Sequence, residues 1–357
     1  MSTIAIALIH WQQKHGRHDL PWQCTKNPYL IWVSEIMLQQ TQVKTVIPFY
    51  QRFIQTFPTV SSLAKADLND VLALWSGLGY YTRCRNLHKA ACMIVDHYQG
   101  IFPDSAAEIQ KLPGIGQTTA AAIAAFAYGE ACTILDGNVK RVLARYFGIN
   151  GYPESRATQQ QLWEKAEAML PQKNTQKNMP IYTQALMDLG AMICTRHAPQ
   201  CNQCPLQSQC TAFLERRVSE LPTPKPKKNL PSKETVFLLL NHHGKILFEK
   251  RVNKGIWEEL WCLPEAQKVS NYQNYCAQSL GIEAICNEQL SSPIDHSFTH
   301  FKLKMYTQQL QVKRIIRQNN LAPVNWVTVD EAFKLAIPTA IRKILSRYQT
   351  LLPRISN

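Results

Sequence analysis

The densest apolar stretch of the chain is YLIWVSEIMLQQTQV at residues 29–43. Its apolar side chains fall nearly all round a helix, so the pattern predicts a helix buried in a core. Glu35 lies inside this run, and burial should raise its pKa towards the range in which a carboxyl group donates a proton. Glu35 is therefore a candidate general acid; the alternative is a Glu that faces solvent or pairs with an Arg. Gln39 and Gln40 follow, and amides at the end of such a helix suit contact with a base edge.

The pattern of the remaining chain indicates two domains. Residues 1–213 read as almost wholly helical, with short Gly or Pro breaks and no alternating strand pattern. A Pro- and Lys-rich linker follows at 221–228, and the composition then changes. The sequence predicts a second, smaller α+β domain with a β-hairpin (235–240 and 245–251), a strand (303–312) and a helix (330–348).

Two segments place a Gly-x-Gly turn between helical patterns: Gly77-Leu78-Gly79 and Gly114-Ile115-Gly116. Such glycines let the backbone approach a ligand, although a tight turn is the commoner explanation. Leu112-Pro113 before the second turn makes it more specific, because the segment resembles the hairpin of helix–hairpin–helix DNA-binding proteins. Tyr80 beside the first turn is either a wedge for a base stack or part of the core.

Asp136 precedes a predicted helix at 139–147, after a turn marked by Gly137. An ordinary helix N-cap explains an Asp at this position. It gains catalytic interest only if Glu35 lies opposite.

Four of the eleven cysteines lie within seventeen residues, at Cys194, Cys201, Cys204 and Cys210. Their intervening gaps of six, two and five residues suit one metal centre, either a zinc site or an iron–sulfur cluster. The spacing alone leaves both open. A disulfide framework is a poor explanation in a chain of this length with an odd number of cysteines.

The charge and length limit the class of protein. At 357 residues two domains are expected, and a net charge of +14 favours a polyanionic partner such as nucleic acid. No apolar run reaches the roughly 18 residues that a membrane span needs, and no basic leader precedes the first apolar segment. We expect a soluble cytoplasmic protein, monomeric and independent of membranes.

Taken together, the motifs resemble the adenine DNA glycosylase (MutY) family of helix–hairpin–helix base-excision enzymes. The segments that carry the resemblance span both domains: LPW at 20–22, SEIMLQQTQV at 34–43, GLGYY at 77–81, LPGIG at 112–116, ILDGNVKRVLAR at 134–145, and the cysteine spacing 194/201/204/210. The resemblance implies a mainly α helix–hairpin–helix glycosylase domain (1–217) with an iron–sulfur cluster loop (194–210), a linker (218–234), and a MutT-like, Nudix-fold domain (235–357). It also implies a [4Fe–4S] cluster on the four cysteines.

The resemblance assigns chemistry to two carboxylates. Glu35 would protonate the five-membered ring of a flipped adenine, and Asp136 would stabilise the positive sugar that develops. Other positions carry over as DNA or substrate contacts: Leu20, Trp22 and Gln184 around the adenine, Gln39 or Gln40 near the mispair, Tyr80 as the wedge, Gly114 and Gly116 in the hairpin, Asn138 beside the catalytic Asp, and Lys140 near a phosphate.

Two further positions define the subfamily. Where endonuclease III-like enzymes have a Lys nucleophile after the hairpin, this chain has Thr118, which also departs from the Ser or Tyr of other members; a hydroxyl cannot form a Schiff base. In the second domain the segment 271–282 has no carboxylate, so nucleotide hydrolysis is not expected. Phe298, Thr299 and His300 match the family's Phe-Ser-His loop that inspects 8-oxoguanine.

The sequence therefore predicts a monofunctional adenine DNA glycosylase that acts on double-stranded DNA with adenine opposite 8-oxoguanine, and less readily opposite guanine. Two rivals stay open. One is a bifunctional endonuclease III-like glycosylase for oxidised pyrimidines, against which Thr118 and the second domain argue. The other is a catalytically silent DNA-binding or redox protein, against which the presence of both Glu35 and Asp136 argues.

Overall fold

The computed structural model describes residues 3–226, 229–267, 271–286, 289–317 and 322–351, and the chain forms two compact units. The first is Met1–Lys65 with Arg85–Lys227, and the second is Ala66–Cys84 with Lys228–Asn357. In this division residues 66–84, from the helical part of the sequence, pack with the C-terminal residues, and the boundary between the units falls inside the expected linker 218–234. Residues 227–228 of the expected linker and 352–357 of the expected second domain lie outside the described residues.

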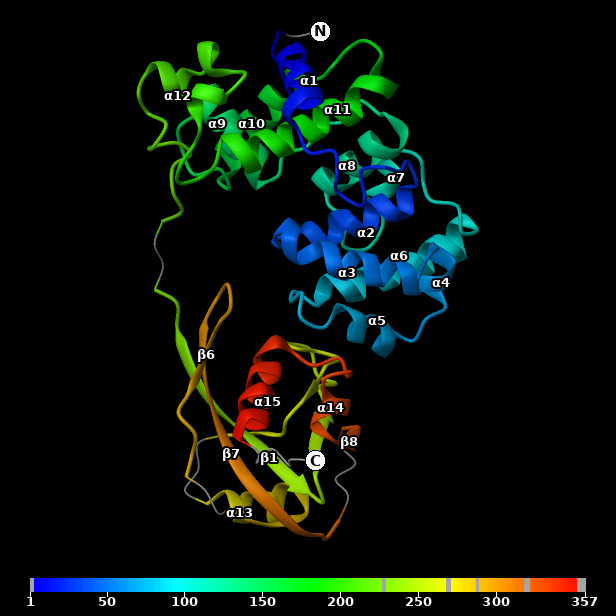
Figure 1. Cartoon of the computed structure of the whole chain (residues 1–357), viewed down its shortest axis with the longest axis vertical. Helices are drawn as coiled ribbons and strands as arrows, with labels where there is room; N and C mark the ends of the chain where they lie inside the picture. The colour runs from blue at the N-terminus through cyan, green and yellow to red at the C-terminus, as the bar shows by residue number, and fades with distance from the viewer. Residues whose placement is uncertain (1–2, 227–228, 268–270, 287–288, 318–321, 352–357) are drawn as a thin grey trace. The chain divides into compact units, whose positions relative to one another are not determined.

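The first unit is helical, as predicted, and its described residues contain no strand (Figure 1). Its helices are α1 (Thr3–His15), α2 (Pro28–Leu38), α3 (Val43–Thr56), α4 (Val60–Ala64), most of α6 (Thr82–Tyr98), α7 (Ala106–Ile109), α8 (Gln117–Tyr128), α9 (Gly137–Tyr146), α10 (Arg156–Ala168), α11 (Thr175–Asp188) and α12 (Thr211–Leu214), with single turns at Leu189–Ile193, Cys201–Gln203 and Gln207–Gln209. None of the helices in the described segments is long and apolar enough to cross a bilayer.

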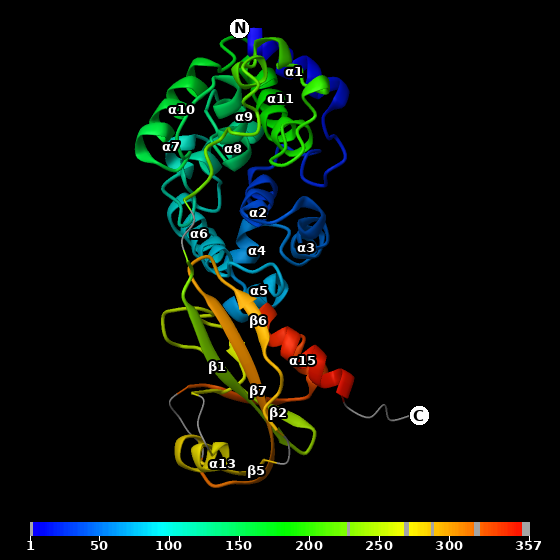
Figure 2. The same cartoon turned by 90° about the vertical axis from the view of Figure 1, so that its left-hand side faces the viewer.

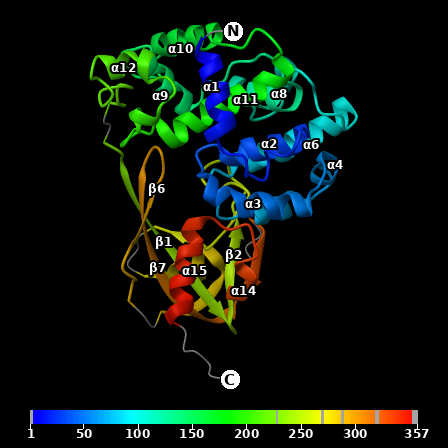
Figure 3. The same ribbon diagram turned by 45° about the horizontal axis from the view of Figure 1, so that its top comes forward.

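The predicted buried helix is α2. Asn27 caps it by accepting a hydrogen bond from the Tyr29 backbone N–H, and Pro28 supplies a first residue whose missing N–H costs nothing there. Its residues from Ile31 to Met37 are buried, apart from Glu35, which is partly buried, and α2 packs against α8. Elsewhere in the unit α1 runs alongside α11 (Figure 3), and both contribute to a core shared with α9.

The predicted helical hairpin is formed by α7, the turn 110–116 and α8. Gly114 has a φ of +78°, and a Cβ added there would lie 2.6 Å from the Cβ of Asn86. Both the backbone conformation and the space therefore require glycine at this position.

The second unit is built on one mixed sheet, with strand order β3-β2-β1-β7-β5 and with β4, β6 and β8 paired to β1, β7 and β2. Its elements are α5 (Leu68–Trp75), β1 (Ser232–His242), β2 (Lys245–Lys250), β3 (Trp261–Cys262), β4 (Glu265–Ala266), α13 (Tyr272–Tyr275) with a following turn at Cys276–Leu280, β5 (Ile282–Ile285), β6 (Ile294–Ser297), β7 (Lys302–Ile315), β8 (Val324–Val327), α14 (Val329–Ala332) and α15 (Thr339–Leu351). The long strands β1 and β7 lie side by side and parallel (Figure 2).

The predicted β1–β2 hairpin and the strand at 303–312 are confirmed, and two boundaries change. β1 begins at Ser232, inside the expected linker, because residues 232–241 pair in register with 302–311 of β7. The single helix expected over 330–348 is two helices, α14 and α15. Pro338 separates them, because proline disfavours helical backbone at the residue before it, Ile337.

Candidate active site

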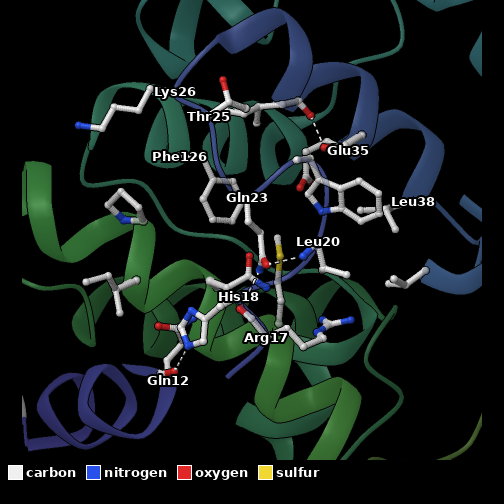
Figure 4. Close-up of a pocket in the computed structure, with 18 of the residues that line it drawn as sticks. Gln12, Arg17, His18, Leu20, Gln23, Thr25, Lys26, Glu35, Leu38 and Phe126 are labelled. Atoms are coloured by element: carbon white, nitrogen blue, oxygen red, sulfur yellow. Dashed lines mark hydrogen bonds between the residues drawn. The ribbon is translucent and has the colours of Figure 1, made fainter. Parts of the chain in front are cut away.

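A cavity of about 460 Å³ lies in the first unit, lined by α1, α2, α8, α11 and the loop between α1 and α2. Its volume falls within the range of roughly 300 to 1,000 Å³ that is usual for small-molecule sites. Figure 4 shows side chains from these elements around it, among them Glu35 and Leu20. Leu20, Trp22 and Gln184, which the sequence assigned to adenine contacts, all line this cavity together with Glu35.

Glu35 is the one acidic side chain among the residues that line this cavity in the described chain. Removal of water raises its pKa to about 8, and the negative charge of Asp136 contributes in the same direction. At neutral pH the carboxyl group is therefore protonated and able to donate a proton. Neither alternative for Glu35, a side chain facing solvent or an ion pair with an Arg, accounts for this raised pKa, because neither would raise it.

Asp136 serves as the N-cap of α9, accepting a hydrogen bond of 2.7 Å from the Val139 backbone N–H. Burial raises its pKa, while the hydrogen bonds from the Val139 and Asn138 backbone and the charges of Arg141 and Lys140 oppose that rise. The N-cap interpretation is thus correct, and it does not exclude the catalytic one. The charge of Asp136 acts directly on Glu35, so the two carboxyl groups form one electrostatic unit.

Two side chains support the backbone around Asp136. The Thr118 hydroxyl accepts a hydrogen bond of 3.2 Å from the Leu135 backbone N–H, directly before Asp136. The Asn138 carbonyl oxygen accepts one of 2.9 Å from Arg141, which also donates to the backbone oxygens of Gly190 and Cys194. The start of α9 is therefore tied both to the helix after the hairpin and to the cysteine segment.

Sequence reasoning missed the network that holds the floor of the cavity. The backbone N–H and Nε of Arg17 each donate to Asp188 at 2.8 Å, and Gln184 Nε2 donates to the same carboxylate. Asp188 is fully buried. This network orients Gln184 and fixes the loop that carries Leu20. A lone Asp late in a helical pattern does not indicate this role in the sequence. The charge of Arg17, close to the Leu-Pro-Trp segment, was the one sign that an acidic partner should lie near that loop.

The polar residues that the family resemblance assigned to DNA contacts, Gln39, Gln40 and Lys140, lie outside the lining of this cavity. Gln39 Nε2 donates to the Thr119 hydroxyl at 3.3 Å, and Gln40 is exposed with a φ of +56°. Lys140 is only 8% exposed, and its ammonium forms an ion pair of 2.8 Å with Glu154. A phosphate contact by Lys140 stays a prediction, and it would have to replace that pair.

All four clustered cysteines line one cavity of about 30 Å³ in the first unit. Burial is the main reason that the pKa of Cys204 rises to about 11, and the charges of the other three thiols contribute to that rise. Arg145, which is buried, donates to Cys194 Sγ at 3.3 Å and to the Thr195 backbone oxygen at 2.7 Å. Within the described residues no group of three or more His, Cys, Asp or Glu side chains is arranged to hold a single metal ion.

The residues assigned to lesion reading form the tip of the β6–β7 hairpin. Phe298 N–H donates to the Phe301 backbone oxygen, which closes a tight turn with Thr299 and His300 exposed at its end. The rings of Phe298 and Phe301 stack with centroids 4.5 Å apart, and Trp257 lies 5.7 Å from Phe298. An aromatic base thus supports two exposed polar side chains.

The chain is similar over nearly its whole length to known repair enzymes. It is 39% identical over 350 residues to the adenine DNA glycosylase of Buchnera aphidicola subsp. Baizongia pistaciae, covering 97% of both chains. The chain belongs to the adenine DNA glycosylase family. It is also 32% identical over 408 residues to the adenine DNA glycosylase of Homo sapiens, covering 96% of this chain and 73% of the human one. It is accordingly an enzyme, a DNA glycosylase of base excision repair.

The two parts of the sequence match two families separately. Residues 33–168 match the HhH-GPD superfamily of base excision DNA repair proteins, and residues 235–347 match the NUDIX domain. The solved structure of a thermostable thymine-DNA glycosylase superimposes with a TM-score of 0.54 at 27% identity, covering 59% of this chain and 95% of that one. The predicted fold class, a helical glycosylase followed by an α+β Nudix-like domain, is confirmed.

The raised pKa of Glu35 makes stability depend on pH. When unfolded, this carboxyl group titrates near 4.5, and when folded it titrates at about 8. Between these values the folded protein keeps a proton that the unfolded chain has released, so the free energy of unfolding falls as pH rises. Glu35→Gln removes this titration. In urea unfolding, the stability of the wild type relative to this variant should therefore fall from about pH 4.5 to about pH 8 and then level off.

Glu108→Gln is the matched control. The Glu108 side chain is partly exposed, and its hydrogen bond with Lys111 lowers its pKa, so above about pH 5.5 it is ionised in both states. The stability difference between the wild type and Glu108→Gln should therefore be flat from about pH 5.5 to about pH 8. An equally flat difference for Glu35→Gln would show that burial does not raise the pKa of Glu35.

Proposed function

We propose that this enzyme hydrolyses the N-glycosidic bond of adenine mispaired with 8-oxoguanine, and less readily with guanine, in double-stranded DNA. The observation that carries the proposal is Glu35 inside a cavity, protonated at neutral pH and electrostatically coupled to Asp136. Two carboxyl groups that act on the same bond need different environments if one is to donate a proton while the other stays ionised.

The two carboxyl groups divide the work. Glu35 donates its proton to the free nitrogen of the five-membered ring, so that adenine leaves as a neutral base. Burial raises the pKa of Asp136, but its backbone hydrogen bonds and the charges of Arg141 and Lys140 act against that rise and favour the ionised form. Asp136 stabilises the positive charge that develops on the sugar, and water completes the hydrolysis.

Adenine must leave the base stack to reach this cavity. Flipping costs about a few kcal/mol, which contacts in the pocket offset. Leu20 and Trp22 supply apolar contact there, and Gln184, fixed by Asp188, presents an amide to the base edge. The net charge of +14 supports phosphate binding, so the affinity for DNA should fall with salt.

The enzyme is proposed to be monofunctional. A lyase needs an amine that forms a Schiff base with the sugar, and the position after the hairpin holds Thr118. The hydroxyl of Thr118 accepts a hydrogen bond from Leu135, which gives the residue a supporting role instead. Lys140 is mostly buried and paired with Glu154, so it is poorly placed to act as that amine.

The opposite base is proposed to be read by the β6–β7 tip. The hydroxyl of Thr299 and the ring of His300 are exposed there, and Phe298 is held from behind by stacking on Phe301. A hydroxyl and an imidazole can each donate and accept hydrogen bonds. They therefore suit the donor and acceptor pattern that separates 8-oxoguanine from guanine.

A single-turnover assay tests this activity. Duplexes with adenine opposite 8-oxoguanine or opposite guanine are incubated with excess enzyme, and each sample is divided into an alkali-treated and an untreated half. Strand cleavage should appear only after alkali, because the enzyme removes the base without cutting the backbone. The rate opposite 8-oxoguanine should exceed the rate opposite guanine.

Two variants of Thr299 test whether its hydroxyl distinguishes 8-oxoguanine from guanine. Thr299→Ala should narrow the rate difference between the two duplexes, and Thr299→Ser, which keeps the hydroxyl, should restore it. Strand breaks without alkali would contradict the monofunctional assignment. The absence of product in both halves would contradict the proposed function itself.

The four cysteines are proposed to hold a [4Fe–4S] cluster, the cofactor that the family resemblance implies. They fit it because their four thiols line one cavity and the buried Arg145 donates to one of them, Cys194. In such a cluster each thiolate binds a different iron. Arg145 beside Cys194 would offset negative charge at this site.

The purified protein should be yellow-brown, with absorbance at roughly 400 nm from thiolate-bound iron. Cys204→Ser should lose most of that absorbance. Cys24→Ser, which changes an exposed cysteine outside the group, should retain it. A colourless wild-type protein that holds one zinc ion would contradict the cluster.

A further inference from the structure

The loop between α5 and α6, Ser76–Tyr81, is tied to the C-terminal part of the second unit through one backbone carbonyl. The oxygen of Ile337 accepts hydrogen bonds from Ser76 Oγ at 2.9 Å and from the Tyr81 hydroxyl at 3.0 Å. Ser76, Tyr81 and Ile337 are all buried. Both ends of the loop are therefore fixed to the same point in the segment that joins α14 to α15.

Arg342, in the first turn of α15, completes this attachment. Its Nη2 donates to Ser76 Oγ and to the Phe333 backbone oxygen, each at 3.0 Å, and its guanidinium lies over the Phe333 ring at 5.2 Å. Ser76 thus accepts from Arg342 while it donates to Ile337. Hydrogen bonds from a charged donor are stronger than neutral ones, so Arg342 is the principal polar contact from α15 to the loop.

Inside the loop the backbone adopts conformations that need such restraint. The φ values of Gly77, Gly79 and Tyr80 are +113°, +74° and +48°. A positive φ is unfavourable for a residue that has a Cβ, so the conformation of Tyr80 is strained. The Tyr81 hydroxyl accepts a hydrogen bond from Gly77 N–H, and the Gly79 oxygen accepts one from Trp75 Nε1. Tyr80, in contrast, is 48% exposed.

From these contacts we infer that Arg342 is a positioning residue, which acts with the Ile337 carbonyl to hold the loop so that Tyr80 is presented in a fixed orientation. The inference rests on the proposed function and on the role that the family resemblance implies for Tyr80, a wedge inserted into the base stack. It implies that the wedge and the tip that reads the opposite base, Phe298–His300, belong to one structural unit. Glu35 and Asp136 belong to the other.

Removal of the C-terminal residues would disturb the loop at Tyr80 as well as the β6–β7 tip. Deleting residues 235–357 would remove Ile337 and Arg342, the hydrogen-bond partners of Ser76 and Tyr81. A truncated enzyme would lose the reading tip and the support of Tyr80 together. Point variants in the full-length protein separate the two effects.

Arg342→Met removes the guanidinium and keeps an unbranched side chain of similar reach. Arg347→Met is the control on the same helix, because Arg347 is exposed and donates to the backbone oxygen and hydroxyl of Ser292 rather than to the loop. Hydrogen exchange of the free proteins should become faster by about tenfold at residues 76–81 in Arg342→Met, the effect expected for losing one charged hydrogen bond. Arg347→Met should match the wild type.

Binding to a duplex with adenine opposite 8-oxoguanine is then measured with every variant in a Glu35→Gln background, which prevents turnover. Arg342→Met should weaken binding by about fivefold or more. Combined with Tyr80→Ala it should cause no further loss, because the two changes remove the same contact. Ser76→Ala breaks the link from the loop side, and it should reproduce both results if Arg342→Met proves poorly folded.

Unchanged exchange at residues 76–81 in both Arg342→Met and Ser76→Ala would overturn the inference. So would a binding loss that persists in full in the Tyr80→Ala background, because Arg342 would then act by another route. Failure of the wild-type enzyme to release adenine would instead overturn the proposed function. The exchange experiment needs no DNA, so it still decides whether α15 holds the loop.

Discussion

The burial of Glu35 next to Asp136 determines what the first unit can do. An apolar helix places the carboxyl group at a cavity wall, and desolvation raises its pKa to about 8. Asp136 adds to that rise while its own charge is supported by the N-terminus of α9. A surface Glu would be ionised at neutral pH and unable to donate a proton. The helix core, the loop after α1 and the contacts around Leu135 and Asn138 serve to keep this pair in place.

The second unit holds features of another kind. The Nudix-like sheet carries the exposed β6–β7 tip that is proposed to read the opposite base, and its described helical segment at 272–280 has no carboxylate. The same unit takes in residues 66–84 from the helical part of the sequence. In the proposed function, contacts with the mispair therefore belong to one unit and hydrolysis to the other. The loop that carries Tyr80 is held by the buried hydroxyls of Ser76 and Tyr81, by Arg342 and, from its own side, by Arg83.

Local patterns in the sequence predicted much of this structure. The mainly apolar run at 29–38 indicated α2, the Asp-Gly pair indicated the start of α9, and two strand-like segments joined across 241–244 indicated the β1–β2 hairpin. Contacts between distant residues were not predictable in this way. Neither the Arg17–Asp188 pair nor the link from Ser76 to Arg342 follows a local period, because each joins residues more than 170 positions apart. The packing of residues 66–84 with the C-terminal residues was not predicted for the same reason, because it also depends on contacts between distant parts of the chain.

The central claim is that Glu35 is held protonated for donation to adenine. The most direct test is the single-turnover rate of adenine release as a function of pH in the full-length enzyme. The rate should stay level up to about pH 7 and fall by roughly tenfold per unit well above the midpoint near 8, where Glu35 ionises. A rate that is unchanged or rising between about pH 8 and 9.5 would contradict the account, because the donor would then not be a carboxyl group titrating there.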